Sequence, residues 1–160
     1  MTDAAARPAD PSSVLHRERL LPSVGTWVVL ALLGAVLGVV LVPLSTTLAL
    51  VVGLVGIAAM CVLGALMSPI VEVSGGRLIA GRAQIEVEVL EEPELLLGED
   101  WTRVMGTGFE PLAHHCTRGW IRSGVRVPLD DDDDPTPAWV VSSRRPQDLV
   151  LALQVARAAV

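Results

Sequence analysis

The amino-acid sequence predicts a membrane α-helical hairpin followed by a small α+β domain, in which antiparallel strands precede a C-terminal helix. Three observations lead to this fold class. No Asp, Glu, Lys, Arg or His occurs between Leu20 and Val71. From residue 70 onward apolar residues alternate with polar ones, which is typical of half-buried strands. The last residues of the chain return to helical spacing.

Residues 1–19 precede the apolar stretch, and their Ala, Pro, Asp and Ser content predicts a disordered cytoplasmic arm. The apolar stretch itself is much longer than the core of a cleaved signal peptide, which has about 7–15 residues. We therefore expect an uncleaved membrane anchor.

Residues 20–69 are expected to form two transmembrane helices, because one crossing needs about 20 apolar residues. Pro43 disfavours one continuous helix, and the Ser and Thr residues that follow it can cap a second helix. We place the two helices at Ser23–Val42 and Thr46–Met67. No ionisable group lies within either span, which argues against a transporter that works alone.

Small residues recur in both predicted helices and permit close approach of helix backbones in lipid. They could form a dimerisation face, or they could seat the two helices of one hairpin against each other. The second interpretation is favoured. The residues concerned are Gly34, Gly38, Gly53 and Gly56.

The distribution of arginines predicts the orientation of the hairpin. Arg17 and Arg19 lie just before the first helix, Arg77 and Arg82 follow the second, and the turn between the helices has no charge. Two spans return the chain to its starting side, and the positive-inside rule makes that side cytoplasmic. We therefore expect a multi-pass protein of the cell inner (plasma) membrane with both termini in the cytoplasm.

Residues 70–160 are expected to form one cytoplasmic domain. Gly75-Gly76 and Gly81-Arg82 are turn signals between short strands. Apolar residues then alternate with glutamates from Ile85 to Val89, which predicts a further strand with one buried face.

A short helix is expected between Glu91 and Trp101. Pro93 would suit its first turn, and Gly98 would suit its end. Residues 102–118 show no readable periodicity.

The stretch from Trp120 to Leu129 predicts a long strand. Arg122 and Arg126 share one of its faces and could pair with the glutamates between Ile85 and Val89 on a neighbouring strand.

Trp139–Ser142 predicts the last strand, and the stretch from Pro146 to about Ala159 predicts a final amphipathic helix. A small, strongly bent sheet closed at one open end by such a helix would bury both apolar faces. This order of elements is similar to that of pleckstrin-homology-like folds.

The charge and cysteine content exclude several classes of protein. All 12 basic residues are Arg, and the net charge is −6. An acidic domain without Lys is a poor candidate for binding nucleic acid, and for electrostatic adhesion to anionic lipid. Cys61 lies in the apolar stretch and Cys116 in the polar part, so no disulfide framework is expected.

Four short motifs follow one another along the chain, at Arg17–Leu20, Val73–Gly81, Pro135–Trp139 and Val141–Pro146. In this order they resemble the actinobacterial domain-of-unknown-function family 3093, a set of small membrane proteins, from about His16 to Ala159. The resemblance implies the two-span topology and supplies no catalytic residue.

His114, His115 and Cys116 could ligate a metal ion or form a Cys–His nucleophilic pair. Zinc prefers four ligands from spaced pairs, and adjacent residues in a flexible loop are not preorganised, so an ordinary surface loop is favoured. The Asp130–Asp134 run lacks the alternating ligands, the Gly and the Glu of an EF-hand. We interpret it as a solvated turn.

Arg144 and Arg145 are the strongest candidates for a binding site. They lie between the last strand and the final helix, where they could bind a phosphate or an acidic partner segment. They could equally pair with the aspartate run or with the acidic face of a strand. The tryptophans of the domain are expected to lie in its core or at the membrane surface; they are Trp101, Trp120 and Trp139.

These observations favour a non-enzymatic integral membrane protein that tethers a small cytoplasmic interaction domain to the inner membrane. The expected partners are membrane lipids around the hairpin and a protein, either a different one or a second copy. No cofactor, metal or nucleic acid is expected. Two alternatives stay open. One is an accessory subunit of a membrane transport or envelope-biogenesis complex that packs through Gly34 and Gly38. The other is an enzyme on a lipid precursor that uses His114, His115 or Cys116.

Overall fold

The computed structural model describes residues 14–130 and 135–159. The chain divides into two compact units. Leu20–Pro69 form a helical hairpin. Residues 14–19 join the described residues from Ile70 onward in the second unit, which we call the domain. We describe the two units separately.

The hairpin consists of α1 (Val24–Leu41) and α2 (Thr46–Leu66), which agree with the predicted helices to within one residue at each end. Each helix begins at a serine whose hydroxyl accepts a hydrogen bond from the first turn. Ser23 Oγ accepts from Thr26 N at 3.3 Å, and Ser45 Oγ accepts from Leu48 N at 3.5 Å. Such caps satisfy backbone donors that the helix leaves unpaired. Both helices are long and apolar enough to cross a membrane.

The glycines of the hairpin lie where α1 and α2 touch. A Cβ atom on Gly34 would lie 2.5 Å from Gly56 O, and one on Gly38 would lie 2.5 Å from Ala49 O and 2.7 Å from Gly53 Cα. These residues therefore lie at the contact between the two helices of one chain.

Replacing Gly38 with Leu is expected to separate α1 from α2, because any side chain at this position collides with the backbone of α2. Overpacking of this kind costs about 1–3 kcal/mol or more. The measurement is the loss of helical circular dichroism when SDS is titrated into protein held in mild detergent. Gly25→Leu is the matched control, since Ser23 Oγ at 3.9 Å is the nearest atom that its Cβ would meet. Equal midpoints for the two variants would contradict the assignment.

The domain begins with a strand that the sequence did not predict. Val14–Arg19 form β1, which pairs antiparallel with β2 (Ile70–Ser74), so that Glu18 lies opposite Val71. The expectation of a disordered arm is therefore wrong for these residues, whereas residues 1–13 lie outside the described part of the chain. The strand is short and polar, and its partner in the sheet lies beyond the whole hairpin, so local composition does not reveal it.

The first sheet has the order β1-β2-β3-β4, with β3 at Arg77–Ala80 and β4 at Ala83–Glu86. Both predicted two-residue turns are confirmed. Gly75 and Gly76 have φ values of 57° and 71°, which only glycine adopts readily. The strand predicted up to Val89 is shorter than expected, because a 3₁₀ turn at Val87–Val89 leads the chain out of the sheet.

The second sheet has the order β5-β7-β8-β6. Its antiparallel strands are β5 (Glu94–Leu97), β7 (Ser123–Pro128) and β8 (Ala138–Ser142), and β6 (His114–Cys116) runs parallel to β8. The helix predicted between Glu91 and Trp101 is misplaced: β5 occupies Glu94–Leu97, and a helix begins only at Gly98. Gly98, with φ of 49°, starts the helix α3 (Gly98–Met105) instead of ending one.

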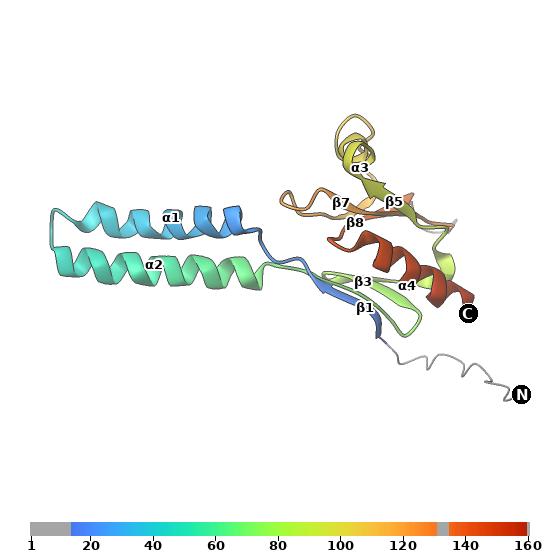
Figure 1. Ribbon diagram of the computed structural model, residues 1–160, viewed down its shortest axis with the longest axis horizontal. Coiled ribbons are helices and arrows are strands. Elements are labelled where there is room, and N and C mark those ends of the chain that lie inside the picture. Colours follow the sequence, from blue (N-terminus) through green and yellow to red (C-terminus); the bar gives the residue numbers. More distant parts are fainter. Residues whose placement is uncertain (1–13, 131–134, 160) are drawn as a thin grey trace, which may run out of the picture. The chain divides into compact units, whose positions relative to one another are not determined.

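The C-terminal helix α4 (Pro146–Ala158) is confirmed and lies between the two sheets (Figure 1). It contacts β1 and β2 of the first sheet and β5 and β7 of the second. Leu149 and Leu153 are almost fully buried along its length. The domain is therefore built from two sheets around one helix, where a single bent sheet was expected.

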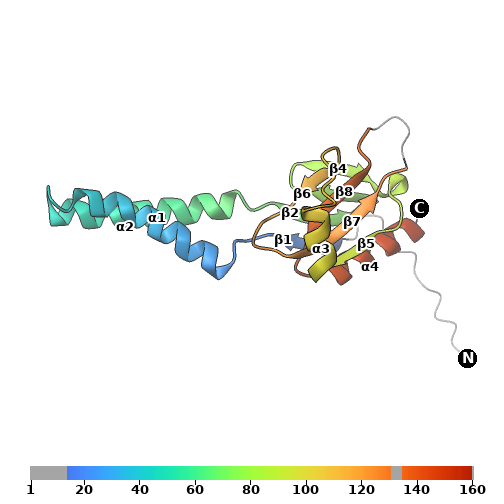
Figure 2. The same cartoon turned by 90° about the horizontal axis from the view of Figure 1, so that it is seen from above.

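Helix α3 covers the opposite face of the second sheet (Figure 2). Trp101 from α3 packs there with Leu96 and Val140. The ring lies so close to the sheet that a Cβ atom on Gly124 of β7 would be 2.6 Å from Trp101 Cζ3 and would also collide with Val141 O. Gly124 is thus the residue that lets α3 dock.

Replacing Gly124 with Ala is expected to lower the stability of the domain by about 1–3 kcal/mol, because Trp101 or the strand must move. The measurement is the urea midpoint from tryptophan fluorescence. Gly119→Ala is the control, since its Cβ would meet nothing within 4 Å. A Gly124→Ala variant as stable as this control would show that the close contact does not exist.

Candidate functional site

A buried polar cluster joins β1 to the turn between β8 and α4. Along β1, His16 and Glu18 point inward and are 5% and 8% exposed, while Arg17 and Arg19 are exposed. This alternation is what a strand with one covered face imposes. At the other side of the cluster, Ser143 is completely buried.

Glu18 is the centre of this cluster, which we call the clamp. Ser143 Oγ donates a hydrogen bond to Glu18 Oε2 at 2.6 Å, and Arg144 N donates to Oε1 at 3.0 Å. Ser143 Oγ accepts in turn from Arg145 N at 3.0 Å. The carboxylate thereby fixes the turn that starts α4, across 125 residues of sequence.

The clamp also controls the charge of Glu18. Burial alone would raise the pKa of this carboxyl group. The neighbouring His16 imidazole, with Nε2 3.8 Å from Oε2, and the hydrogen bonds from Ser143 and Arg144 outweigh that effect, so that the pKa falls from 4.5 to about 2. Glu18 is therefore ionised at neutral pH. His16 Nε2 has no hydrogen-bond partner among the described residues.

The hydrogen bonds of the clamp stabilise the fold. The Ser143 hydroxyl donates directly to a carboxylate and is shut off from solvent, whereas a nucleophilic serine needs a general base and access for a substrate. Ser143 is tied further to β7, since Ser123 Oγ donates to Ser143 O at 2.6 Å. The clamp therefore joins the two sheets.

Arg144 and Arg145, the strongest sequence candidates, flank this clamp. Their backbone N–H groups donate hydrogen bonds to Glu18 and Ser143 of the clamp, and both side chains are exposed. Arg145 Nη2 donates to Arg17 O at 3.3 Å, and Arg145 Nη1 lies 4.0 Å from Asp148 Oδ2. A second pair of arginines, from β1, is thus brought beside them.

His114, His115 and Cys116 form strand β6 and not the expected loop. Successive side chains of a strand point to opposite faces. Accordingly, the His114 ring lies 4.3 Å from the Trp139 ring, whereas His115 stacks on Phe109 at 4.5 Å. The three residues do not converge on one point, and the described residues contain no group of three or more His, Cys, Asp or Glu that could hold a metal ion.

The ionisation of these residues points the same way. Burial raises the pKa of the Cys116 thiol, against a smaller opposite effect of Arg118. Burial, and then the charge of His115, lower the pKa of His114. An activated cysteine has a depressed pKa, so the geometry gives no support to a Cys–His nucleophilic pair.

The structure also shows where the other residues singled out in the sequence lie. Trp101 and Trp139 are buried in the domain. Asp130 is exposed, and Asp131–Asp134 lie outside the described residues. Arg126 binds Glu94 and Glu110, at 3.3 and 3.0 Å. The predicted pairing of Arg122 and Arg126 with Glu86 and Glu88 is therefore wrong for Arg126, because β4 and β7 belong to different sheets.

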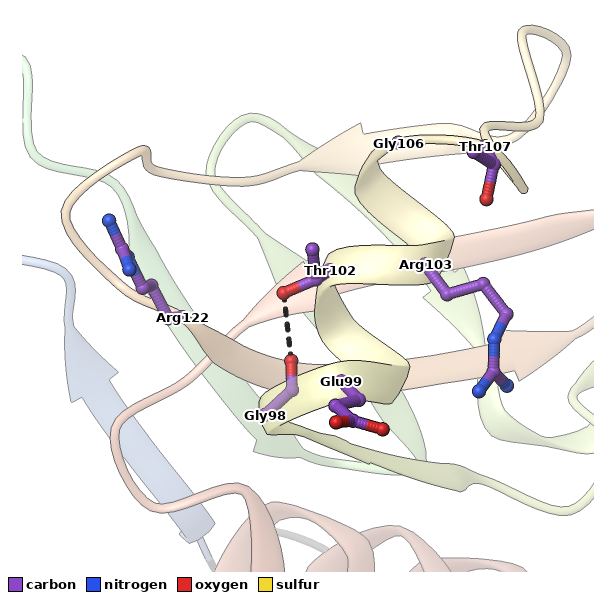
Figure 3. A pocket seen from close by; sticks show the side chains of 7 residues that line it. All are labelled: Gly98, Glu99, Thr102, Arg103, Gly106, Thr107 and Arg122. Atoms are coloured by element: carbon purple, nitrogen blue, oxygen red, sulfur yellow. Dashed lines mark hydrogen bonds between the residues drawn. The ribbon is translucent and has the colours of Figure 1, made fainter.

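A shallow hollow of about 690 Å³ lies beside α3 (Figure 3). Thr102 Oγ1 on its floor donates to Gly98 O at 2.9 Å. Figure 3 shows that the Arg103 and Arg122 side chains on its rim point away from each other. Ligand sites usually have a few convergent polar groups, and this hollow lacks them.

Sequence reasoning missed His16, Glu18 and Ser143. Two sequence patterns could have indicated them. One is the alternation His-Arg-Glu-Arg before the apolar stretch, and the other is the pair of serines that precedes Arg144. Both belong to motifs on which the family resemblance rests.

These features define a class of protein: a small α+β domain whose first two strands are separated in sequence by an apolar helical hairpin. The chain belongs to DUF3093, a family of proteins of unknown function, whose family model matches residues 15–153. The match includes both sides of the clamp. Comparison with curated proteins and with solved structures gives no match.

Proposed function

We propose that the chain is a non-enzymatic integral membrane protein that holds a small cytoplasmic domain at the inner membrane. One observation carries the proposal: the apolar hairpin leaves the domain from β1 and returns to it in β2, and these strands are neighbours, with Arg19 opposite Ile70. The hairpin is thus inserted into the fold and is not attached by a linker.

This topology supports the predicted orientation. Because β1 and β2 pair within one domain, both ends of a spanning hairpin lie on one side of the membrane. The arginines near those ends favour the cytoplasmic side. The exposed side chains of α1 and α2 are mostly Val and Leu, which suit a lipid environment.

Reporter fusions test the proposal. Alkaline phosphatase is active only outside the cytoplasm, so a fusion in the turn at Ser45 is expected to be active and a fusion at the C-terminus inactive. The chain is also expected to remain in the membrane fraction after alkaline carbonate washing. Release into the supernatant, or an active C-terminal fusion, would refute the proposal.

We further infer that the domain is a variant of the pleckstrin-homology-like architecture. The supporting features are the antiparallel β1-β2-β3-β4 sheet, a second four-stranded sheet and the C-terminal helix that packs between them. The parallel strand β6 and helix α3 are departures from the pattern expected from the sequence. An experimental structure of the domain tests this inference directly.

The domain is proposed to bind a protein, either a different one or a second copy. Crosslinking in native membranes followed by purification is expected to give a defined adduct. A preparation without any adduct would count against an interaction module. Gly34 and Gly38 contact α2, so an accessory subunit of a larger membrane complex would have to pack through other faces of the hairpin.

A further inference from the structure

Of the eleven arginines that the structure describes in the domain, seven lie toward one end of it. In the first sheet, Arg19 ends β1 beside Ile70, and Arg82 lies in the turn from β3 to β4, where Ala80 pairs with Ala83. Because Gly81 N donates to Ile70 O at 2.8 Å, this turn and the start of β2 lie side by side. Both arginine side chains are exposed.

The second sheet contributes to the same end. The loop of residues 117–122 and the turn of residues 143–145 adjoin each other, because Gly124 pairs with Ser142 and Arg118 N donates to Ser142 Oγ at 3.0 Å. The clamp between Ser143 and Glu18 then brings these segments to the end of β1. We call this surface the basic end. Its arginines are Arg17, Arg19, Arg82, Arg118, Arg122, Arg144 and Arg145.

The opposite end of the domain is acidic. There the 3₁₀ turn after β4 meets the end of β7, since Leu90 pairs with Leu129 and Asp130 N donates to Val89 O at 3.0 Å. The carboxylates in this region are exposed. They belong to Glu86, Glu88, Glu91, Glu92 and Asp130. The acidic net charge of the chain therefore conceals an uneven distribution, in which arginines are more frequent at one end of the domain and carboxylates at the other.

Carboxylates also lie at the basic end. Glu99 lines the same hollow as Arg122, and Glu18, Glu72 and Asp148 lie near Arg144, Arg17 and Arg145. Glu18 is buried within the clamp and presents no charge to solvent. Arg17 Nε lies 3.5 Å from Glu72 Oε2, but the Arg17 side chain is 63% exposed. The Arg145 side chain, near Asp148, is 58% exposed. Exposed pairs of this kind contribute at most about 1 kcal/mol, so Arg17 and Arg145 can exchange these partners for other anions.

The basic end is also the end from which the hairpin departs. Arg19 is bonded to Leu20, and Pro69 is bonded to Ile70. If the hairpin spans the membrane, as proposed above, Arg19 and Ile70 lie close to the lipid headgroups, because they are bonded to the ends of the hairpin. Each Arg near an anionic surface contributes about 1 kcal/mol, and guanidinium binds phosphate in a bidentate manner.

The acidic end lies too far from the basic end to cancel this attraction. A strand of five residues, such as β2, spans about 16 Å. The Debye length at physiological ionic strength is about 8 Å. The carboxylates at the far end are therefore screened from the surface that the basic end touches.

We propose that the basic end of the domain binds the headgroups of anionic phospholipids in the membrane that anchors the chain. This inference rests on the proposed function. It departs from the expectation, taken from the acidic charge and the absence of Lys, that the domain is a poor candidate for adhesion to anionic lipid. Such binding would hold the domain in one orientation, with its acidic end toward the cytoplasm.

Hydrogen exchange of the full chain in lipid nanodiscs tests the proposal. One nanodisc contains only phosphatidylcholine, and the other also contains phosphatidylglycerol. We expect amides of residues 81–82, 117–122 and 143–145 to exchange several-fold more slowly with phosphatidylglycerol, and high salt to abolish the difference. Amides of residues 87–92, at the acidic end, are expected to exchange equally in both nanodiscs.

Two matched double variants distinguish the loss of arginine charge at the basic end from a general effect of removing arginines on folding. Arg144→Gln/Arg145→Gln is expected to lose most of the lipid-dependent protection. Arg77→Gln/Arg157→Gln, which removes two arginines outside the basic end, is expected to keep it. Equal exchange in both nanodiscs, or equal behaviour of the two variants, overturns the proposal. So does protection by inorganic phosphate added to the phosphatidylcholine nanodisc, because the site would then bind free anions.

The same data report separately on the membrane anchor. Amides of α1 and α2 that are protected in both nanodiscs support a hairpin within the bilayer, whatever the domain does. If these amides exchange freely, the proposed function fails. If these amides are protected, but hydrogen exchange at the basic end is the same with and without phosphatidylglycerol, only the lipid-binding proposal fails.

Discussion

A chain in which an Asn-Gly turn replaces residues 21–68 is expected to fold as an independent domain, whereas residues 70–160 alone are expected to stay unfolded. The first variant keeps β1 beside β2, with a turn that suits a two-residue connection. The second loses an edge strand and the contacts of α4 with β1. It also leaves the Ser143 hydroxyl and Arg144 N without their acceptor. Small domains are stable by about 5–15 kcal/mol, and these losses together approach that value.

Circular dichroism and urea unfolding of the two soluble proteins measure this difference. The turn variant is expected to unfold cooperatively, and the fragment is expected to show no transition. A third variant, with the turn and with the order of residues 14–19 scrambled, separates the effect of β1 from that of chain length. A cooperative transition in the fragment would show that β1 is dispensable.

Replacing Glu18 with Ala is expected to destabilise the domain by about 2–4 kcal/mol. The change leaves the buried Ser143 hydroxyl and the N–H of Arg144 unpaired, and such groups are costly in a dry interior. The urea midpoint of the turn variant measures the effect. Glu72→Gln is the control, because Glu72 pairs with the exposed Arg17 at the surface, and its loss is expected to cost less than about 1 kcal/mol.

The stability that depends on the charge of Glu18 is expected to vary with pH. The pKa of the folded state, about 2, lies below the ordinary value of 4.5. The folded state therefore binds the proton more weakly than the unfolded state does. The contribution, roughly 3 kcal/mol, is complete above pH 4.5 and is lost as the pH falls through 2.

Glu18→Gln, which keeps the size of the side chain, tests this dependence. Between pH 5 and pH 2 the unmodified protein is expected to lose more stability than this variant, by an amount on the order of 3 kcal/mol. Parallel pH profiles of the two proteins would show that the carboxylate is not held in its charged form.

The hairpin could be predicted closely because its signals are local. Ser23 and Ser45 cap the helices from adjacent positions, and Pro43 lies in the turn. The Gly75-Gly76 turn was predictable for the same reason, since the φ values required there favour glycine at both positions.

Elements that depend on distant partners could not be predicted. Leu95, Leu96 and Leu97 form an apolar run that fits a helix or a strand equally well, and pairing with β7 decides the outcome. Gly98 ended the predicted helix, because glycine is common at that position, but here its positive φ begins α3.

The candidate site was predicted only in part, for a related reason. Arg144 and Arg145 stand out in the sequence as a charged pair beside Pro146. Glu18, which fixes their position, lies in a segment whose composition indicates no structure. A buried carboxylate becomes evident only when β1 is paired with β2 and covered by the turn before α4.

If the hairpin inserts into a membrane as proposed, its position between β1 and β2 makes assembly of the domain depend on correct insertion. A ribosome adds about 5–20 residues per second, so β1 waits several seconds while Leu20–Pro69 are made. If only one helix crossed the membrane, β1 and β2 would emerge in different compartments and could not pair. Such a chain would keep α4 and both sheets unassembled, open to proteases. Only correctly threaded molecules would therefore mature and persist.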